Sequence, residues 1–497
     1  MGSSLFTLFY AFLVGWFHWT RVWTDHYFEA GTVYIFYNAF RVAFLLYFAL
    51  ILFALGRSFL RWIAPMKVDL QLDSLSRFLL ASYVGAAVFE IVMVILGFLH
   101  LYYPMVALIL TLPWAFLSFP ALKKFLGEIP RILQKAIPEG FGYQRVTHGL
   151  LMGAALFLLI DLLVKKGLFP DIVGSDPVGH YLPYFNKVLT RHHLWPNQYF
   201  LNYFYLKGAG LNFLVLLLTD IQGSQLASFY YLTLSALTLY ALTRKMSFSM
   251  PWSCAAVIIY LKSFMIPLEV QFSKSHAAVS FWLAAILWLT LTVLEDEKKK
   301  PKLWTFPFIL VVVALTLRAP TSLVFTLPYF FSFMTILWAV RRIDRAKTFL
   351  VLFLIGASMM AIIFSFNYWS SGVMEMTPSN VFLPHANISV MKQSWSPYVF
   401  LLIYELSEHA STWMLPLHFR IHDASFWQIF RPHVFRDFFP FLRLDASYLP
   451  AMSLYPVLFI MVFIRRKSLE PYFRRVILCV GIMSAVSLSI LLSGVLF

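Results

Sequence analysis

The acidic residue best placed for chemistry is Asp176, in a polar segment over residues 170–196. This segment follows an apolar run and is the most polar stretch in the first half of the chain. A carboxylate just outside a membrane span, beside a cavity between helices, can be tuned by burial and neighbouring charges to act as a general base. The alternative is a structural role, because Asp176-Pro177 is a good helix N-cap followed by proline at the first helical position. Asp171 is a second candidate base, with turn formation as its alternative.

Basic residues follow Asp176 on what their spacing predicts to be a short helix. Lys187 and Arg191 are four residues apart and would lie on one helix face, an arrangement that suits a phosphate group. A solvated face, or one that contacts lipid headgroups, is the alternative interpretation. The adjacent residues His192 and His193 do not indicate a metal site, because neighbours on a helix point apart and no further ligands are spaced to join them.

Further candidates lie at helix ends on the predicted outer side. Arg318 stands alone at the end of a strongly apolar run, and an ionisable residue at membrane depth is a functional-site hypothesis by default. Its alternative is snorkelling of the guanidinium to the headgroups. Lys274 and His276 carry the same two interpretations. The predicted substrate-binding residues, all at or beyond the outer ends of apolar runs, are His180, Tyr181, Lys187, Arg191, Arg318, Lys274 and His276.

The composition indicates an integral membrane protein. Of 497 residues, 60% are hydrophobic and only 12% are charged, whereas a soluble chain carries about 25% charged residues. Repeated apolar runs of roughly 17–25 residues are typical of helices that cross a hydrocarbon core. The predicted fold class is therefore all-α, a polytopic transmembrane helical bundle. The chain contains no P-loop, nucleophile elbow, metalloprotease motif or dinucleotide fingerprint, which excludes nucleotide-driven pumps, serine hydrolases and zinc proteases of the usual kinds.

The formal net charge of +16 comes from short basic clusters between apolar runs. Such clusters are what positive-inside topology produces. Nucleic-acid binding is not favoured, because no basic face or recognition motif accompanies the charge. Attraction to anionic headgroups or to phosphate-bearing lipids fits better. Both cysteines, Cys254 and Cys479, lie inside apolar runs, so neither a disulfide framework nor a thiolate zinc site is indicated.

The basic clusters also predict sidedness. Clusters over residues 57–67 and 123–145 are predicted to be cytoplasmic, which places the N-terminus inside and the polar segment outside. Lys165 and Lys166 are the basic residues that depart from this pattern. Residues 199–218, interrupted by a lysine and two glycines, predict a helix lying at the interface. The sequence predicts about thirteen spans, over residues 5–19, 33–55, 78–99, 101–119, 148–164, 226–242, 252–265, 277–294, 304–317, 322–340, 349–366, 451–464 and 476–496.

The predicted domain organisation has four parts. Residues 1–147 form N-terminal transmembrane helices added to a core, and residues 148–366 form that core, with a first extracytoplasmic loop over 165–224. Residues 367–449 form a second extracytoplasmic region, rich in aromatic residues, proline and histidine. Residues 450–497 carry the last two transmembrane helices.

Several motifs occur in a recognisable order between residues 149 and 384. A span is followed by Asp176-x-x-x-His180-Tyr181-Leu182-Pro183, then by Leu194-Trp195-Pro196, and later by a span ending in Arg244-Lys245. This order resembles the GT-C superfamily, polytopic glycosyltransferases that use lipid-phosphate-linked sugars. Arg318-Ala-Pro-Thr-Ser resembles the outer helix end where bacterial members place a basic residue, and Asn367-Tyr368…Gly372…Pro378 resembles the opening of their later loop.

The resemblance implies a membrane glycosyltransferase of inverting type with a GT-C-like core. Asp176 occupies the place of the family's catalytic acidic residue and would deprotonate an acceptor hydroxyl. That oxygen would attack the anomeric carbon of a polyprenyl-phosphate sugar. Arg318, with Lys187 or Arg191, would stabilise the departing phosphate.

The resemblance also implies partners and a location. The partners are a polyprenyl-phosphate-linked sugar donor, membrane lipids, and a glycan, lipid or protein acceptor. The active site would face the extracytoplasmic side of a bacterial inner membrane. Many members carry a second acid near the start of the span at 277–294, where this chain has Lys274-Ser275-His276. No cofactor is therefore expected, and a two-carboxylate or metal-dependent mechanism is disfavoured, with a divalent metal as the alternative that the sequence does not support.

Two other functions fit parts of the sequence. A polysaccharide polymerase or ligase also has many spans and a long outer loop, and its working residues would be Arg420, Arg431 and Arg436. A lipid or solute transporter is the alternative outside enzymes. Paired helices broken by glycine or proline in corresponding halves, which would favour a transporter, are not evident.

Overall fold

The computed structural model describes residues 28–63, 74–118, 120, 143–168, 182–194, 210–219, 223–245, 248–262, 266, 270, 276–295, 302–318 and parts of 350–365. These residues are all-helical and contain no strand, which confirms the predicted helical class. The number of spans stays a prediction, because the predicted spans at 5–19, 322–340, 451–464 and 476–496 lie outside these ranges. The chain divides into two compact units, Met1–Tyr47 and Phe48–Phe497. Within the first unit, the structure describes the beginning of helix α2.

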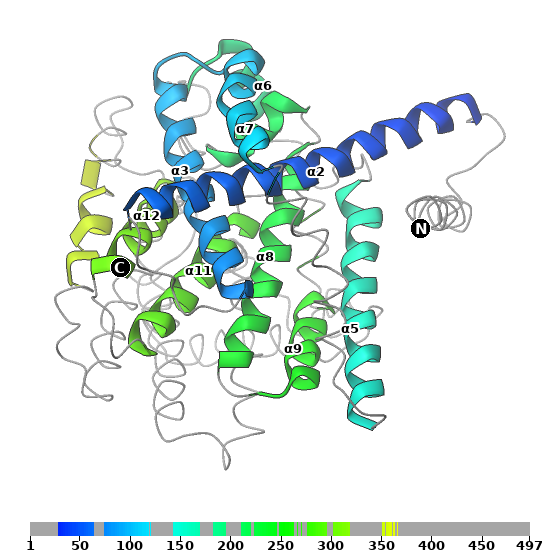
Figure 1. Cartoon of the computed structure of the whole chain (residues 1–497). Coiled ribbons are helices and arrows are strands. Elements are labelled where there is room, and N and C mark those ends of the chain that lie inside the picture. The colour runs from blue at the N-terminus through cyan, green and yellow to red at the C-terminus, as the bar shows by residue number, and fades with distance from the viewer. Residues whose placement is uncertain are drawn as a thin grey trace, which may run out of the picture. The chain divides into compact units, whose positions relative to one another are not determined.

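Figure 1 shows the helices along the chain. Their bounds are α2 Phe28–Ile63, α3 Ser74–Phe98, α5 Tyr143–Leu162, the π-helical turn η2 Leu163–Gly167, α6 Leu182–Arg191, α7 Leu211–Leu218, α8 Ser224–Lys245, α9 Met250–Lys262, α11 His276–Glu295 and α12 Lys302–Arg318. A further apolar helix, Pro104–Ser118, follows α3 after a short turn.

Three of the described helices are long and apolar enough to cross a membrane. They comprise Asn38–Trp62 of α2, Leu75–Phe98 of α3, and α8. The last two lie within a few residues of the spans predicted at 78–99 and 226–242, because a long apolar run between polar flanks specifies its own helix. Shorter apolar helices, including Pro104–Ser118 and Val146–Leu162 of α5, also fall on predicted spans.

The core of the second unit is built around α3, α8 and α11. Helix α8 packs against α9 and α11, whereas α3 packs against α7, α8 and α12. Inside this core the hydroxyl oxygens of Tyr83 and Thr238 lie 2.6 Å apart and join α3 to α8. Because α3 belongs to residues 1–147 and its partners to 148–366, the described packing extends across the predicted boundary between the N-terminal helices and the core.

A glycine-lined crossing fixes α2 against α3. A Cβ added at Gly56 would overlap the backbone carbonyl of Ala81, and one added at Gly85 would overlap the carbonyl of Leu52. Small residues permit this approach, which membrane helices use in place of the hydrophobic effect. The rings of Phe53 and Phe78 stack beside the crossing at 5.6 Å.

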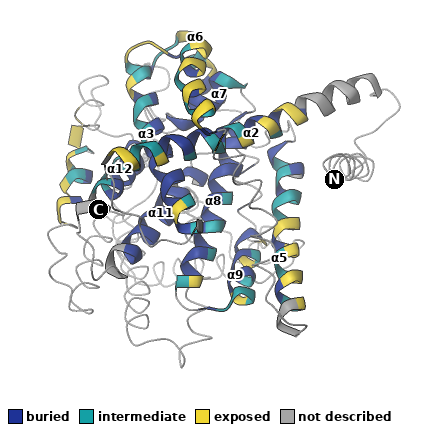
Figure 2. Ribbon diagram, viewed as in Figure 1, coloured by how far each residue is buried: buried dark blue, intermediate teal, exposed yellow. Residues whose placement is uncertain are grey.

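Apolar side chains also cover much of the surface. Figure 2 shows exposed residues along α5, in contrast to the buried α8 and α11. On the helix Pro104–Ser118, Met105, Ile109 and Phe116 are among the large hydrophobic residues that remain exposed. Contiguous apolar surface of this kind marks an interaction with membrane or protein in soluble folds. On helices as apolar as these, such surface is consistent with contact with lipid.

Candidate functional site

Helix α6 is the described part of the polar segment that carries its cations. Phe185 and Val188 are buried, whereas Lys187 is partly exposed and Arg191 is exposed. The two cations lie one turn apart, and partial burial followed by the charge of Arg191 lowers the pKa of Lys187. The predicted arrangement of two cations on one short helix is therefore present. The described part of α6 is Leu182–Arg191, and Asp176-Pro177, with its two alternative roles, lies outside the described residues.

The residues after α6 are hydrogen-bonded to the turn that follows α3. The backbone N–H of Tyr102 donates to the carbonyl of His192 at 3.2 Å, and the N–H of Leu194 donates to the carbonyl of Gly97 at 3.0 Å. Nδ1 of His192 lies 2.8 Å from the carbonyl oxygen of Tyr102. A carbonyl only accepts, so this nitrogen carries the proton. Residues 97–103 and 192–194, joined in this way, are named the clasp below.

Two histidines in the clasp have unusual backbone conformations. His100, after α3, and His192, after α6, both have φ of 61°. Helices often end with a residue in this left-handed region, where glycine is favoured. For other residues the conformation costs about 1–2 kcal/mol. The hydrogen bonds between the two turns hold both residues there.

Aromatic and imidazole rings meet on the outside of the clasp. The ring of His192 stacks on Tyr103 with centroids 4.0 Å apart, and the ring of His193 contacts His100 at 4.4 Å. The two adjacent histidines therefore have different partners. Burial, followed by the charges of His100, Arg191 and His192, lowers the pKa of His193. Among the residues that the structure describes, no group of three histidine, cysteine or carboxylate side chains could hold a metal ion.

Tyr102 of the clasp lies close to Glu90, a buried polar residue of α3. Its side chain is fully buried and its ring stacks on Phe213 of α7 at 5.0 Å. Burial raises the pKa of Tyr102 well above its ordinary value, and Tyr184 and Glu90 add to the effect. Deprotonation of this phenol is therefore disfavoured.

Glu90 holds the beginning of α7. Its side chain, in the middle of α3, is 1% exposed, and its Oε2 accepts the backbone N–H of Leu211 at 3.0 Å. Gly210 has φ of 77°, and a Cβ added there would overlap the Glu90 carboxyl. Glycine is thus required both by the backbone conformation and by the close approach. The positive end of the α7 dipole favours negative charge at the Glu90 carboxyl.

Helix α7 is also held from α8, where the hydroxyl of Tyr231 donates to Oδ1 of Asn212 at 3.1 Å. Every residue from Leu211 to Leu217 is buried. The sequence instead predicts a helix lying at the interface over 199–218. Residues 199–209 lie outside the described part of the chain. Helix α7, which follows Gly210, packs against α3 and α8, where its two polar anchors are satisfied. Figure 1 shows α6 and α7 beside the end of α3.

The other predicted site residues divide into two groups. Arg318 is the last residue of α12 and His276 is the first residue of α11, two helices that pack against each other. Their side chains are outside what the structure describes. Asp171, Asp176, His180, Tyr181 and Lys274 also lie beyond the described ranges, so their roles stay predictions.

Two residues were not predicted from the sequence, Glu90 beside the start of α7 and His100 beside the end of α6. Glu90 had a usable signal, since a single carboxyl in an apolar run is a functional-site hypothesis by default. His100 had no such signal in the sequence, because it lies in an ordinary short turn between two apolar runs. Its relation to His193 depends on contacts between segments far apart in the chain.

The likeness to polytopic glycosyltransferases is carried by local motifs, chiefly the one that begins at Asp176. The structure describes the paired cations of α6 and the hydrogen bonds that attach the end of α6 to α3, and the likeness itself stays a prediction. The chain matches no protein-family model, no curated protein sequence and no solved structure.

Proposed function

We propose that this protein is a membrane glycosyltransferase that moves a sugar from a polyprenyl-phosphate donor to an extracytoplasmic acceptor, with inversion. The observation that carries the proposal is the pair of cations on α6, which follows Asp176 within one polar segment and is fixed to the end of an apolar helix. A base and a phosphate-binding pair at the membrane surface are what this reaction requires. The proposal includes about thirteen spans and a GT-C-like core around this segment.

In the proposed reaction, Asp176 accepts the proton of the acceptor hydroxyl, with Asp171 as the second candidate. The acceptor oxygen forms a bond to the anomeric carbon while the bond from that carbon to the phosphate oxygen breaks. The lipid phosphate leaves with the electron pair. Lys187 and Arg191 stabilise its charge, since fixed cations act most strongly where charge develops in the transition state.

The remaining predicted residues have supporting roles in the proposal. Arg318 contacts the donor phosphate from the end of α12, and His276 is the first residue of the neighbouring helix α11, with Lys274 two residues before it in the sequence. His180 and Tyr181 contact the sugar or the acceptor. No metal or other cofactor is required in this scheme. The enzyme is proposed to lie in a bacterial inner membrane with its site facing outward.

Substitution of Asp176 tests the proposal. Asparagine caps a helix about as well as aspartate but accepts no proton at neutral pH. Asp176→Asn is expected to keep the thermal stability of the wild type and to lower sugar transfer by about 10²–10⁴-fold, the usual range for loss of a general base. The measurement is transfer from a polyprenyl-phosphate sugar by purified protein.

Asp176→Ala is the matched comparison. If Asp176 is only a cap, the alanine variant loses stability while the asparagine variant keeps full activity. Full transfer by Asp176→Asn would remove Asp176 as the base. Asp171→Asn would then test the second candidate.

A further inference from the structure

Two histidines of the clasp, His100 and His193, lie close to Arg191 at the end of α6, and these three basic side chains are named the basic patch. His100 and Arg191 are exposed and His193 is partly exposed. Burial is the largest cause of the lowered pKa of His193. The other causes are the charges of three basic side chains, His100, Arg191 and His192. Folding thus brings like charges together at the surface. An anion bound among them would offset their repulsion.

The position of the basic patch along the chain places it at a membrane surface. The membrane-spanning stretch of α3 ends at Phe98 and the next apolar helix begins at Pro104, so the turn between them must reach the edge of the hydrocarbon core. Leu99, Leu101 and Tyr103 in this turn are exposed. Apolar side chains and a tyrosine next to cations are typical of the headgroup region.

We propose that the basic patch binds the phosphate group of an anionic lipid. The guanidinium of Arg191 suits two phosphate oxygens at once. The ring of His193 adds charge when it is protonated, and the ring of His100 can donate a hydrogen bond. Leu99 and Leu101 would contact the hydrocarbon chain of the same lipid. This inference shares Arg191 with the proposed donor-phosphate site, but it does not require sugar transfer, since a phospholipid of the surrounding bilayer has the required chemistry.

The proposed site has a defined dependence on pH. Because the folded-state pKa of His193 lies below the ordinary value of 6.5, the unfolded chain binds more protons, and the clasp loses stability as the pH falls through this range. A bound phosphate favours the protonated rings and opposes that loss. Anionic lipid should therefore bind more tightly, and stabilise the protein more, at lower pH. The charged groups that face His193 are His100 from the turn after α3, and Arg191 and His192 from the end of α6.

The test is lipid binding by purified protein in neutral detergent, measured by native mass spectrometry with phosphatidylglycerol and with phosphatidylcholine at about pH 5.5 and about pH 7.5. The wild type is expected to prefer phosphatidylglycerol, more strongly at the lower pH. The double variant His100→Gln/His193→Gln should lose the pH dependence while retaining the binding seen at the higher pH. Arg191→Gln should weaken phosphatidylglycerol binding by about fivefold at both pH values.

Arg61→Gln is the matched control, because it removes an exposed arginine from the end of α2. It is expected to bind phosphatidylglycerol like the wild type. An equal loss in Arg61→Gln and Arg191→Gln, or no preference for phosphatidylglycerol, would overturn the proposal. Displacement of the lipid by inorganic phosphate at a few millimolar would assign the patch to a soluble phosphate instead.

Two further measurements distinguish failure of the lipid-binding proposal from poor folding of a variant and from failure of the proposed glycosyltransferase. If a variant of the patch folds poorly, added salt provides a second test in the wild type, because screening should weaken phosphatidylglycerol binding. Salt-independent binding would contradict the proposal. Asp176→Asn is expected to bind phosphatidylglycerol normally, so failure of the proposed glycosyltransferase would leave the lipid result standing.

Discussion

A carboxyl group inside an apolar helix needs a fixed polar partner, and Glu90 has one in the backbone of α7. The partner is a helix N-terminus, whose exposed N–H groups and dipole favour negative charge. Gly210 supplies the conformation and the space for this contact. A single residue of α3 thereby fixes the start of a helix that belongs to a different predicted part of the chain.

Two substitutions of Glu90 separate the hydrogen bond from the charge. Glu90→Gln keeps an acceptor oxygen for the Leu211 N–H and loses charge next to the helix dipole, which should lower the free energy of unfolding by about 1 kcal/mol. Glu90→Leu removes the acceptor and should cost about 1–3 kcal/mol, because a buried N–H is left unsatisfied. Thermal unfolding in detergent, together with amide hydrogen exchange at the beginning of α7, measures both effects. Wild-type protection of Leu211 in Glu90→Leu would contradict this role.

At the scale of elements, helices in this protein are joined by close backbone approach and by specific hydrogen bonds. The crossing of α2 and α3 depends on Gly56 and Gly85. The clasp depends on the two turns that follow α3 and α6. Both contacts act between segments that are already helical, so they decide how the helices are placed and not whether they form.

The glycine crossing can be tested with a matched pair of alanine substitutions. A Cβ at Gly85 would overlap a backbone carbonyl of α2, and the backbone cannot move aside as a side chain can. Gly85→Ala should therefore lower the stability of the protein by about 1–3 kcal/mol, the usual cost of overpacking. Gly153 in α5 has nothing within 4 Å of an added Cβ, so Gly153→Ala should be neutral or slightly stabilising. Equal melting temperatures for the two variants in detergent would contradict the described crossing.

The sequence predicted the helices better than it predicted their contacts. Apolar length alone located α3 and α8, and the spacing of Lys187 and Arg191 predicted their common helix. The burial of α7 was not predicted, because it depends on Glu90 and Tyr231, which are distant in sequence from the residues they anchor. His100 was missed for the same reason. The predicted base, Asp176, lies outside the residues that the structure describes.

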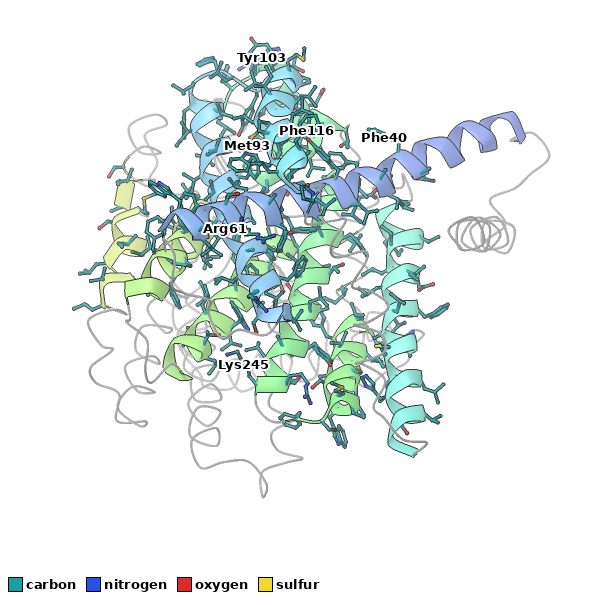
Figure 3. The ribbon with its side chains drawn as sticks, in the orientation of Figure 1. Phe40, Arg61, Met93, Tyr103, Phe116 and Lys245 are labelled. Carbon is teal, nitrogen blue, oxygen red and sulfur yellow. The ribbon has the colours of Figure 1, made fainter. Side chains whose placement is uncertain are left out.

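At the scale of the second unit, the clasp also constrains topology. It joins the turn after α3 to the end of α6, so both must lie on one side of the membrane. Figure 3 shows Tyr103 of the clasp and Lys245, the last residue of α8, at opposite ends of the packed helices. Basic residues at the end of α8 agree with a cytoplasmic position under the positive-inside rule. The predicted sidedness thus puts the clasp outside.

Cysteine labelling tests this topology in intact cells. In a background carrying Cys254→Ala and Cys479→Ala, single cysteines are introduced by Leu99→Cys, Thr190→Cys and Lys245→Cys. Leu99 and Thr190 are exposed and Lys245 is partly exposed. The first two variants should react with a membrane-impermeant maleimide, and the third should react only after permeabilisation. The cysteine-free parent is the control for background labelling.

The three labelling results distinguish the fold from its orientation. Reaction of Leu99→Cys and Thr190→Cys from opposite sides would contradict the clasp itself, because hydrogen bonds join the two turns directly. Reaction of both from the cytoplasmic side would leave the clasp intact and reverse the membrane orientation. In that case α6 and its cations would face the cytoplasm, and the proposed transfer to an extracytoplasmic acceptor would be wrong.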